Sequence, residues 1–206
     1  VRAHVIDFEM FSRMAFTASG TDKAYMWHMS AAPGAAGSQP PFRALAEIAR
    51  PSPAVFKAQL EFLESYADLR GDRAPEILGQ MDMTRAFFAS IPYLRPDRTK
   101  WTLELLDAAY RLALFVEMRF KHALACRRPM EYSPQVQPMI LTPSHGSLPS
   151  GHSCESFSAA LVLWMLLRES PTAPYRDVMW GEQLMRQASR IAINRIPIAT
   201  NQGFKS

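Results

Sequence analysis

The chain has 206 residues, of which 48% are hydrophobic and 20% charged, and its net charge is +4. These values are typical of one globular domain that buries roughly two-thirds of its unfolded surface. The mild positive charge favours anionic small molecules, but it is not gathered into a basic run of the kind that binds nucleic acid. Two cysteines are too few for a disulfide scaffold, and they do not form a CxxC metal pair.

The sequence predicts no membrane span. Its longest apolar run, Ala159–Leu167, is about half of the ~20 residues that cross a bilayer. We therefore expect a soluble protein. The chain begins with Val1, so a signal could have been removed, and the compartment stays open between periplasmic or secreted and cytoplasmic.

The first fifty residues are weakly patterned. Glycine and proline predict a loop at Ala31–Pro41, and a short helix is expected at Phe42–Arg50. No segment shows a convincing β pattern.

A helix start follows at Ser52 and Pro53, with serine as the N-cap and proline in the first helical position. This helix is expected to run to about Leu69 and to be stopped by Gly71. Residues 74–91 suggest one or two shorter helices.

The second half of the chain is strongly helical in pattern. Apolar residues recur at helical spacing over Lys100–Arg127, and Pro129 ends that run. The proline-rich residues 130–149 predict an irregular loop. Two further helices are expected, at Gly151–Leu167 and from about Tyr175 to Ile196.

The predicted class is all-α, a single-domain helical bundle over residues 1–206. Residues 1–99 would form an N-terminal helical part, 100–196 the core helices of the site, and 197–206 a tail. The apolar N-terminal half could also serve as a homodimer surface.

A cluster of chemically matched residues lies between Lys121 and His152. Lys121 and Arg128 are seven residues apart, about two helical turns, so both can project from one helix face. Ser150 and Gly151 stand where a loop enters a helix, and backbone N–H groups there are free to bind an anion. These features together predict a site for a phosphate-like oxyanion.

Each of these residues has a plainer explanation when taken singly. Lysine and arginine on a helix usually form a solvated face, and a Ser-Gly pair is usually a cap. Most histidines near a helix start are structural, although the ordinary pKa of His152, about 6.5, suits proton transfer near neutrality.

Jointly, Lys-x6-Arg-Pro at Lys121 to Pro129 and Pro-Ser-Gly-His at Pro149 to His152 resemble two signatures of one superfamily. It contains the type 2 phosphatidic acid phosphatases, the bacterial non-specific acid phosphatases and the vanadium-dependent haloperoxidases. The resemblance covers about 30 residues directly, and it implies an all-α fold.

The resemblance also implies roles. In the phosphatases a histidine of a third signature attacks phosphorus, and the second-signature histidine, here His152, protonates the leaving alcohol. Lys121, Arg128, Ser150 and Gly151 would hold the equatorial oxygens. In the haloperoxidases the same groups hold vanadate, and His152 would assist proton transfer to and from peroxide.

The third signature, Ser-Arg-x5-His-x3-Asp, is incomplete. Its best match is Asn194-Arg195, which makes Arg195 the third cationic residue but places Asn201 and Lys205 at the histidine and aspartate positions. The alternative start, Ser189-Arg190, places Ile196 and Thr200 there. No histidine follows His152, so no direct protein ligand to a metal is visible. Either a stretch after Ile196 is missing or the nucleophile has been lost; we favour the first.

His145 precedes Ser150 by five residues, in the loop that leads into the predicted site. In the haloperoxidases the matching position holds histidine in bromoperoxidases and an aromatic residue in chloroperoxidases. His145 therefore favours peroxidase chemistry, and the alternative is a loop histidine with a local hydrogen bond.

Three functions follow from the sequence. The leading one is a soluble phosphoester hydrolase that needs no cofactor. The second is a vanadium-dependent haloperoxidase, with vanadate as cofactor and His145 near the halide. The third is a catalytically silent anion-binding homologue. All three take a small phosphate, phosphoester or vanadate partner.

Overall fold

The computed structural model of the chain describes residues 1–30, 41–81 and 84–198. The predicted loop at Ala31–Pro41 lies outside the described residues apart from Pro41, as does the predicted tail at 197–206 apart from its first two residues. None of the helices in those three ranges combines the length and the hydropathy that a bilayer-spanning helix requires.

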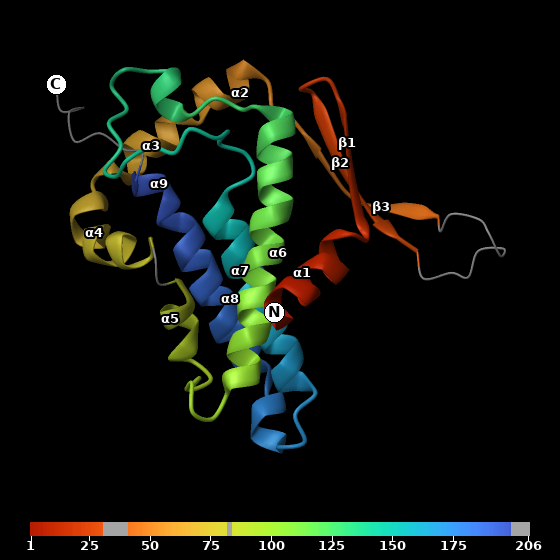
Figure 1. Cartoon of the computed structure of the whole chain (residues 1–206). Coiled ribbons are helices and arrows are strands. Elements are labelled where there is room, and N and C mark those ends of the chain that lie inside the picture. Colours follow the sequence, from red (N-terminus) through yellow and green to blue (C-terminus); the bar gives the residue numbers. More distant parts are fainter. Residues whose placement is uncertain (31–40, 82–83, 199–206) are drawn as a thin grey trace.

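The fold is α+β, so the predicted all-α bundle is wrong. The N-terminal half contains a three-stranded antiparallel sheet in the order β1-β2-β3 (Figure 1). Its strands are β1 Met14–Ser19, β2 Lys23–Met29 and β3 Phe42–Ala49. β3 takes the place of the predicted helix at Phe42–Arg50.

The sheet escaped sequence analysis because both of its faces carry apolar or aromatic side chains. On β2, Ala24 and Met26 pack against the helix at Lys100–Leu124, whereas Tyr25 and Trp27 alternate with them and contact each other. Such a strand shows no apolar/polar alternation. β3 reads FRALAEIA, with three alanines, one leucine and one glutamate, which favour helix in isolation, and its pairing with β2 overrides that preference.

One long helix, α6 (Lys100–Leu124), is the spine of the molecule. Figure 1 shows the sheet and α1 (Arg2–Phe11) on one side of α6, with α7 (Gly151–Arg168) and α8 (Val178–Ile193) on the other. α1 is fixed to the spine by Phe11, whose ring stacks on that of Phe115 at 4.1 Å between centroids. The main core fills the space between α5, α6, α7 and α8, and its buried members are Phe88, Leu106, Ala159, Ala160, Leu163, Leu184, Ala188 and Ile191.

α6 ends earlier than predicted. Ala125 adopts the left-handed conformation (φ 46°), and its N–H bonds the Lys121 carbonyl, which closes the helix at Leu124. Arg128 therefore does not share a helix face with Lys121, as the seven-residue spacing had predicted. It stands in extended backbone before a 3-10 turn, η1 (Pro129–Glu131).

The later helices agree more closely with the sequence. α7 (Gly151–Arg168) matches the predicted helix at Gly151–Leu167. The last predicted helix is divided into α8 (Val178–Ile193) and α9 (Arg195–Ile198), preceded by a 3-10 turn, η2 (Ala173–Arg176).

Four short helices connect the sheet to the spine. They are α2 (Pro53–Ala58), α3 (Leu60–Ala67), α4 (Arg70–Gly79) and α5 (Thr84–Ala89). Ser52 is the N-cap of α2 as predicted, because its hydroxyl accepts a bond from the Val55 N–H. Gly71 does not stop a helix but lies within α4, so that prediction is wrong. α3 and α4 both contact α9.

α7 and α8 cross closely at Gly181. A Cβ atom on this glycine would lie 2.8 Å from two ring atoms of Trp164, so only glycine allows this approach. Both helices carry core residues, so the crossing fixes the frame on which α7 presents its N-terminus.

We predict that Gly181→Ala lowers the free energy of unfolding by about 1–3 kcal/mol, because the added methyl group overpacks the crossing. Gly71→Ala is the matched control, since nothing lies within 4 Å of its Cβ position. The control should be neutral or more stable by up to about 1 kcal/mol. Urea denaturation measures the free energy of unfolding of both variants. A Gly181→Ala protein as stable as wild type would contradict the close contact between α7 and α8 at this residue.

Candidate functional site

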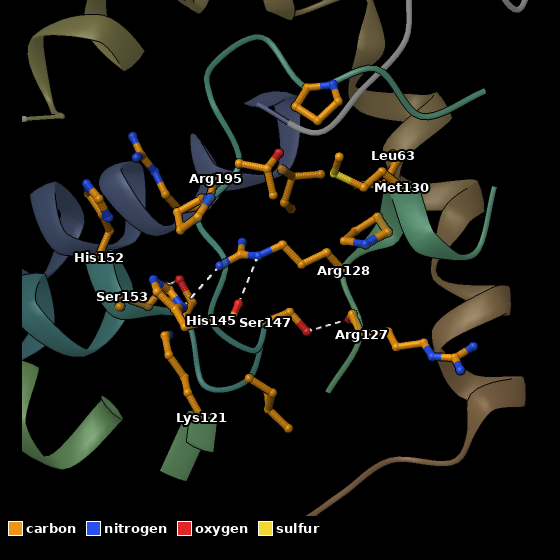
Figure 2. A pocket seen from close by; sticks show the side chains of 18 of the residues that line it. Leu63, Lys121, Arg127, Arg128, Met130, His145, Ser147, His152, Ser153 and Arg195 are labelled. Carbon is orange, nitrogen blue, oxygen red and sulfur yellow. Dashed lines mark hydrogen bonds between the residues drawn. The ribbon is translucent and has the colours of Figure 1, made fainter. Parts of the chain in front are cut away.

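A cavity of about 620 Å³ lies where α3, α6, α7 and α9 meet the segment that joins α6 to α7 (Figure 2). Every residue that the sequence nominated for the site lines this cavity. They are Lys121, Arg128, His145, Ser150, Gly151, His152 and Arg195. We call this set the cradle.

Lys121 reaches the cradle from the last full turn of α6 and is 2% exposed. Its ammonium group donates a hydrogen bond to the Pro149 carbonyl, one residue before the N-cap of α7. Gly146 lets the loop come this close, because a Cβ there would lie 2.8 Å from the Lys121 carbonyl oxygen. The lysine thus joins the end of α6 to the beginning of α7.

Arg128 is held by the same loop. Its Nε donates to the His145 carbonyl and one terminal nitrogen contacts the ring Nδ1 of His145, both at 3.1 Å. The same Nδ1 lies 3.0 Å from the Gly146 carbonyl, which can only accept, so the protonation of Nδ1 decides which of its two contacts is a hydrogen bond. Figure 2 shows Arg128 directed toward His145 and Arg127 directed away from it.

The N-terminus of α7 supplies hydrogen-bond donors. Ser150 is the N-cap, and the first N–H groups of a helix have no partner within the helix. The Ser153 hydroxyl donates to the Ser150 hydroxyl at 2.9 Å. Ser153 also lines the cavity, although the sequence analysis did not nominate it.

His152 is oriented by Gln80, the residue that follows α4. Its Nε2 lies 3.1 Å from the backbone carbonyl of Gln80, and because a carbonyl only accepts, Nε2 carries the proton. Burial, followed by the charge of Arg195, lowers the pKa of His152 to about 4. The imidazole is therefore neutral at pH 7 while the cradle is empty, rather than poised near its ordinary pKa. An anion in the cradle would raise this pKa.

Arg195 completes the cationic side of the cradle. One terminal nitrogen donates to the side-chain oxygen of Gln80 at 3.0 Å, and its buried Nε has no hydrogen-bond partner among the described residues. Burial lowers the pKa of Arg195 to about 10, so it stays charged at pH 7. Gln80 is fully buried and links Arg195 to His152, a role that no sequence pattern indicated.

The structure places the arginines of the two possible third-signature alignments in different surroundings. Arg195 lines the cavity, whereas Arg190 forms a two-pronged ion pair with Glu76 outside it, at 2.6 Å between the closest atoms. The Asn194-Arg195 alignment is the one that fits the cradle. Its histidine and aspartate positions, Asn201 and Lys205, lie outside the described residues.

Two carboxyl groups line the same cavity and were missed. The Glu117 Oε1 atom is 3.9 Å from the Lys121 ammonium, and burial raises the pKa of Glu117 to about 7. Burial also raises the pKa of Glu155 on α7. The signal for Glu117 was present in the sequence, because it precedes Lys121 by four residues and so shares its helix face.

Most of the other lining residues are apolar and come from α3, α6 and the α6–α7 segment. They include Leu60, Leu63, Leu114, Met130, Val136, Pro138, Ile140 and Leu141, and polar side chains such as Gln59, Arg127 and Thr142 lie among them. The cavity therefore has a charged end and an apolar end, which suits an oxyanion attached to an organic group.

Comparisons of this chain with protein-family models, with curated proteins and with solved structures gave no match. The resemblance to the phosphatase and haloperoxidase superfamily therefore depends on the motif residues alone.

Glu117 should make stability depend on pH. Its pKa is about 7 in the folded chain against an ordinary 4.5, so the folded state binds more protons between these values. Its favourable contribution is complete below pH 4.5 and is lost as the pH rises through 7. We predict that Glu117→Gln gains on the order of 3 kcal/mol relative to wild type between pH 4.5 and 8.

Urea denaturation at several pH values measures this difference. Glu64→Gln, at an exposed position on α3, is the control and should run parallel to wild type. If the Glu117→Gln curve also runs parallel to wild type, the shifted pKa is wrong.

Proposed function

We propose that the protein is a phosphoester hydrolase of this superfamily and that it binds the phosphoryl group in the cradle. The observation that carries the proposal is the convergence of Lys121, Arg128 and Arg195 with the N-terminus of α7 on one cavity. Three cations and a set of backbone donors match an oxyanion whose negative charge grows in the transition state.

The cradle supplies positive charge and holds its hydrogen-bond donors in fixed orientations. The guanidinium group of Arg128 can donate to two oxygens of an anion, and its contacts with His145 fix the plane of the group. Arg195 offers a buried Nε that has no partner in the described part of the chain. A buried donor without a partner is costly, and an anion oxygen would satisfy it.

In this proposal His152 is the general acid. A bound dianion raises the pKa of His152 from about 4, so that under acidic conditions a larger share of the imidazole carries the second proton. Nε2 then stays on the Gln80 carbonyl, and the proton on Nδ1 is the one given to the leaving oxygen. The Gln80 carbonyl plays the orienting part that a carboxylate plays beside other catalytic histidines.

The nucleophile is the remaining requirement. The position of the attacking histidine corresponds to Asn201, so hydrolysis and anion binding must be tested separately. Release of p-nitrophenol from its phosphate ester, with a burst of acid-labile phosphoenzyme, would support the hydrolase. Phosphate binding without either signal would support the silent anion-binding homologue.

We predict that His152→Ala lowers kcat for p-nitrophenyl phosphate by about 100-fold or more, because proton transfer to the leaving group is lost. Competitive inhibition by inorganic phosphate should change far less. His122→Ala, an exposed neighbour of Lys121 on α6, is the control and should match wild type. An unchanged kcat in His152→Ala would show that His152 is not the general acid.

A vanadium-dependent haloperoxidase is the second candidate, and the position of His145 favours it. The ring of His145 lines the cavity and contacts Arg128. The oxygens of vanadate would be held by the same cradle, and bound vanadate would supply peroxide activation for halide oxidation. The residue set fits the oxygens, but the position of the histidine that bonds vanadium in the family is Asn201 here.

Bromination of a phenol dye tests this candidate. It should require both vanadate and peroxide, and His145→Ala should reduce it while leaving vanadate binding measurable. His122→Ala serves again as the control. Dye bromination that is equal with and without vanadate would exclude the peroxidase.

A further inference from the structure

Glu117 and Lys121 form a buried pair one helical turn apart on α6. Glu117 is 4% exposed and Lys121 is 2% exposed, and their charged atoms are 3.9 Å apart. The Oε2 atom of Glu117 is buried and has no hydrogen-bond partner in the described residues. Such an atom is costly to bury unless something binds it or the carboxyl group is protonated.

The carboxyl group of Glu117 also touches the N-terminus of α7. A Cβ on Gly151 would lie 2.6 Å from Oε1 and 2.8 Å from Oε2. The carboxyl group therefore lies beside both Lys121 and the first residue of α7, close to the positive end of that helix, where an oxyanion is stabilised. A carboxylate at this place repels a second anion at close range.

We propose that Glu117 is a positioning residue that serves as the counter-charge of Lys121 in the empty cradle and takes up one proton from solvent when an oxyanion binds. The inference rests on the proposed oxyanion site. Protonation of Glu117 removes its repulsion of the bound anion and gives Oε2 a proton to donate. The charge of Lys121 is then no longer compensated by Glu117 and can stabilise the ligand.

Several charged or titratable groups lie near Glu117 and affect its protonation. Lys121 on its own helix favours the carboxylate, whereas Glu155 on α7 disfavours it. The thiol of Cys154, also on α7, is the other titratable group beside the carboxyl. A bound dianion adds negative charge to the side of Glu155, so the carboxyl of Glu117 is pushed further toward its protonated form.

The test uses sulfate, a tetrahedral dianion that does not titrate near neutrality. Calorimetric titration in two buffers of different ionisation enthalpy gives the number of protons taken up on binding. For the wild-type chain we expect uptake of about one proton at pH 8 and an affinity that falls up to about tenfold per pH unit above the pKa. His152 begins from a lower pKa, near 4, and so contributes less at this pH.

Two variants assign the proton. Glu117→Gln keeps the shape of the protonated side chain, so uptake should fall close to zero and sulfate affinity should become nearly independent of pH from 6 to 8. Glu155→Gln removes the other carboxyl of the cavity and should keep the uptake. Proton uptake that survives in Glu117→Gln, or vanishes only in Glu155→Gln, would overturn the assignment.

The wild-type chain provides a measurement that does not depend on whether a variant folds. Infrared difference spectra should show a protonated carboxyl band appearing when sulfate is added at pH 8. Sulfate binding with no proton uptake and no such band overturns this inference but leaves the proposed function standing. If sulfate binds neither wild type nor Glu117→Gln, the proposed oxyanion site and this inference both fail.

Discussion

The bond from the Lys121 ammonium to the Pro149 carbonyl is the contact on which the rest of the site depends. It ties the C-terminal turn of α6 to the residue before the N-cap of α7, and so it sets where the first N–H groups of α7 point. Because Lys121 is buried, its charge acts through a medium that screens it poorly. The same lysine thus fixes the start of α7 relative to the end of α6 and supplies much of the positive potential in the cavity.

The cradle combines charges of both signs. Lys121, Arg128 and Arg195 face one cavity, yet Glu117 and Glu155 line it as well, and burial raises the pKa of both carboxyls. The net charge of the cavity therefore shifts with protonation. With both carboxyls ionised its net positive charge is small, and with either one protonated it is more complementary to an anion. This explains how the fold tolerates so many ionisable groups away from water.

The residues that the sequence nominated line one cavity, whereas the all-α fold predicted around them is wrong. The residues of the two signatures line one cavity because Lys121 stands near the end of α6 and Ser150 and Gly151 stand at the start of α7. The sheet was missed because its strands are apolar on both faces. The position of Arg128 was missed because a left-handed Ala125 ends α6, and only tertiary contacts select that conformation. Gln80 joins the site from a distant helix, which no local pattern can predict.

The central claim is that a tetrahedral oxyanion binds among Lys121, Arg128, Arg195 and the first turn of α7. A crystal structure of the chain soaked in tungstate tests it most directly, because tungsten gives a strong anomalous signal. The account predicts one dominant peak in the cavity, within hydrogen-bonding distance of those groups. A cavity without a peak, with tungstate only on exposed cations, would contradict it.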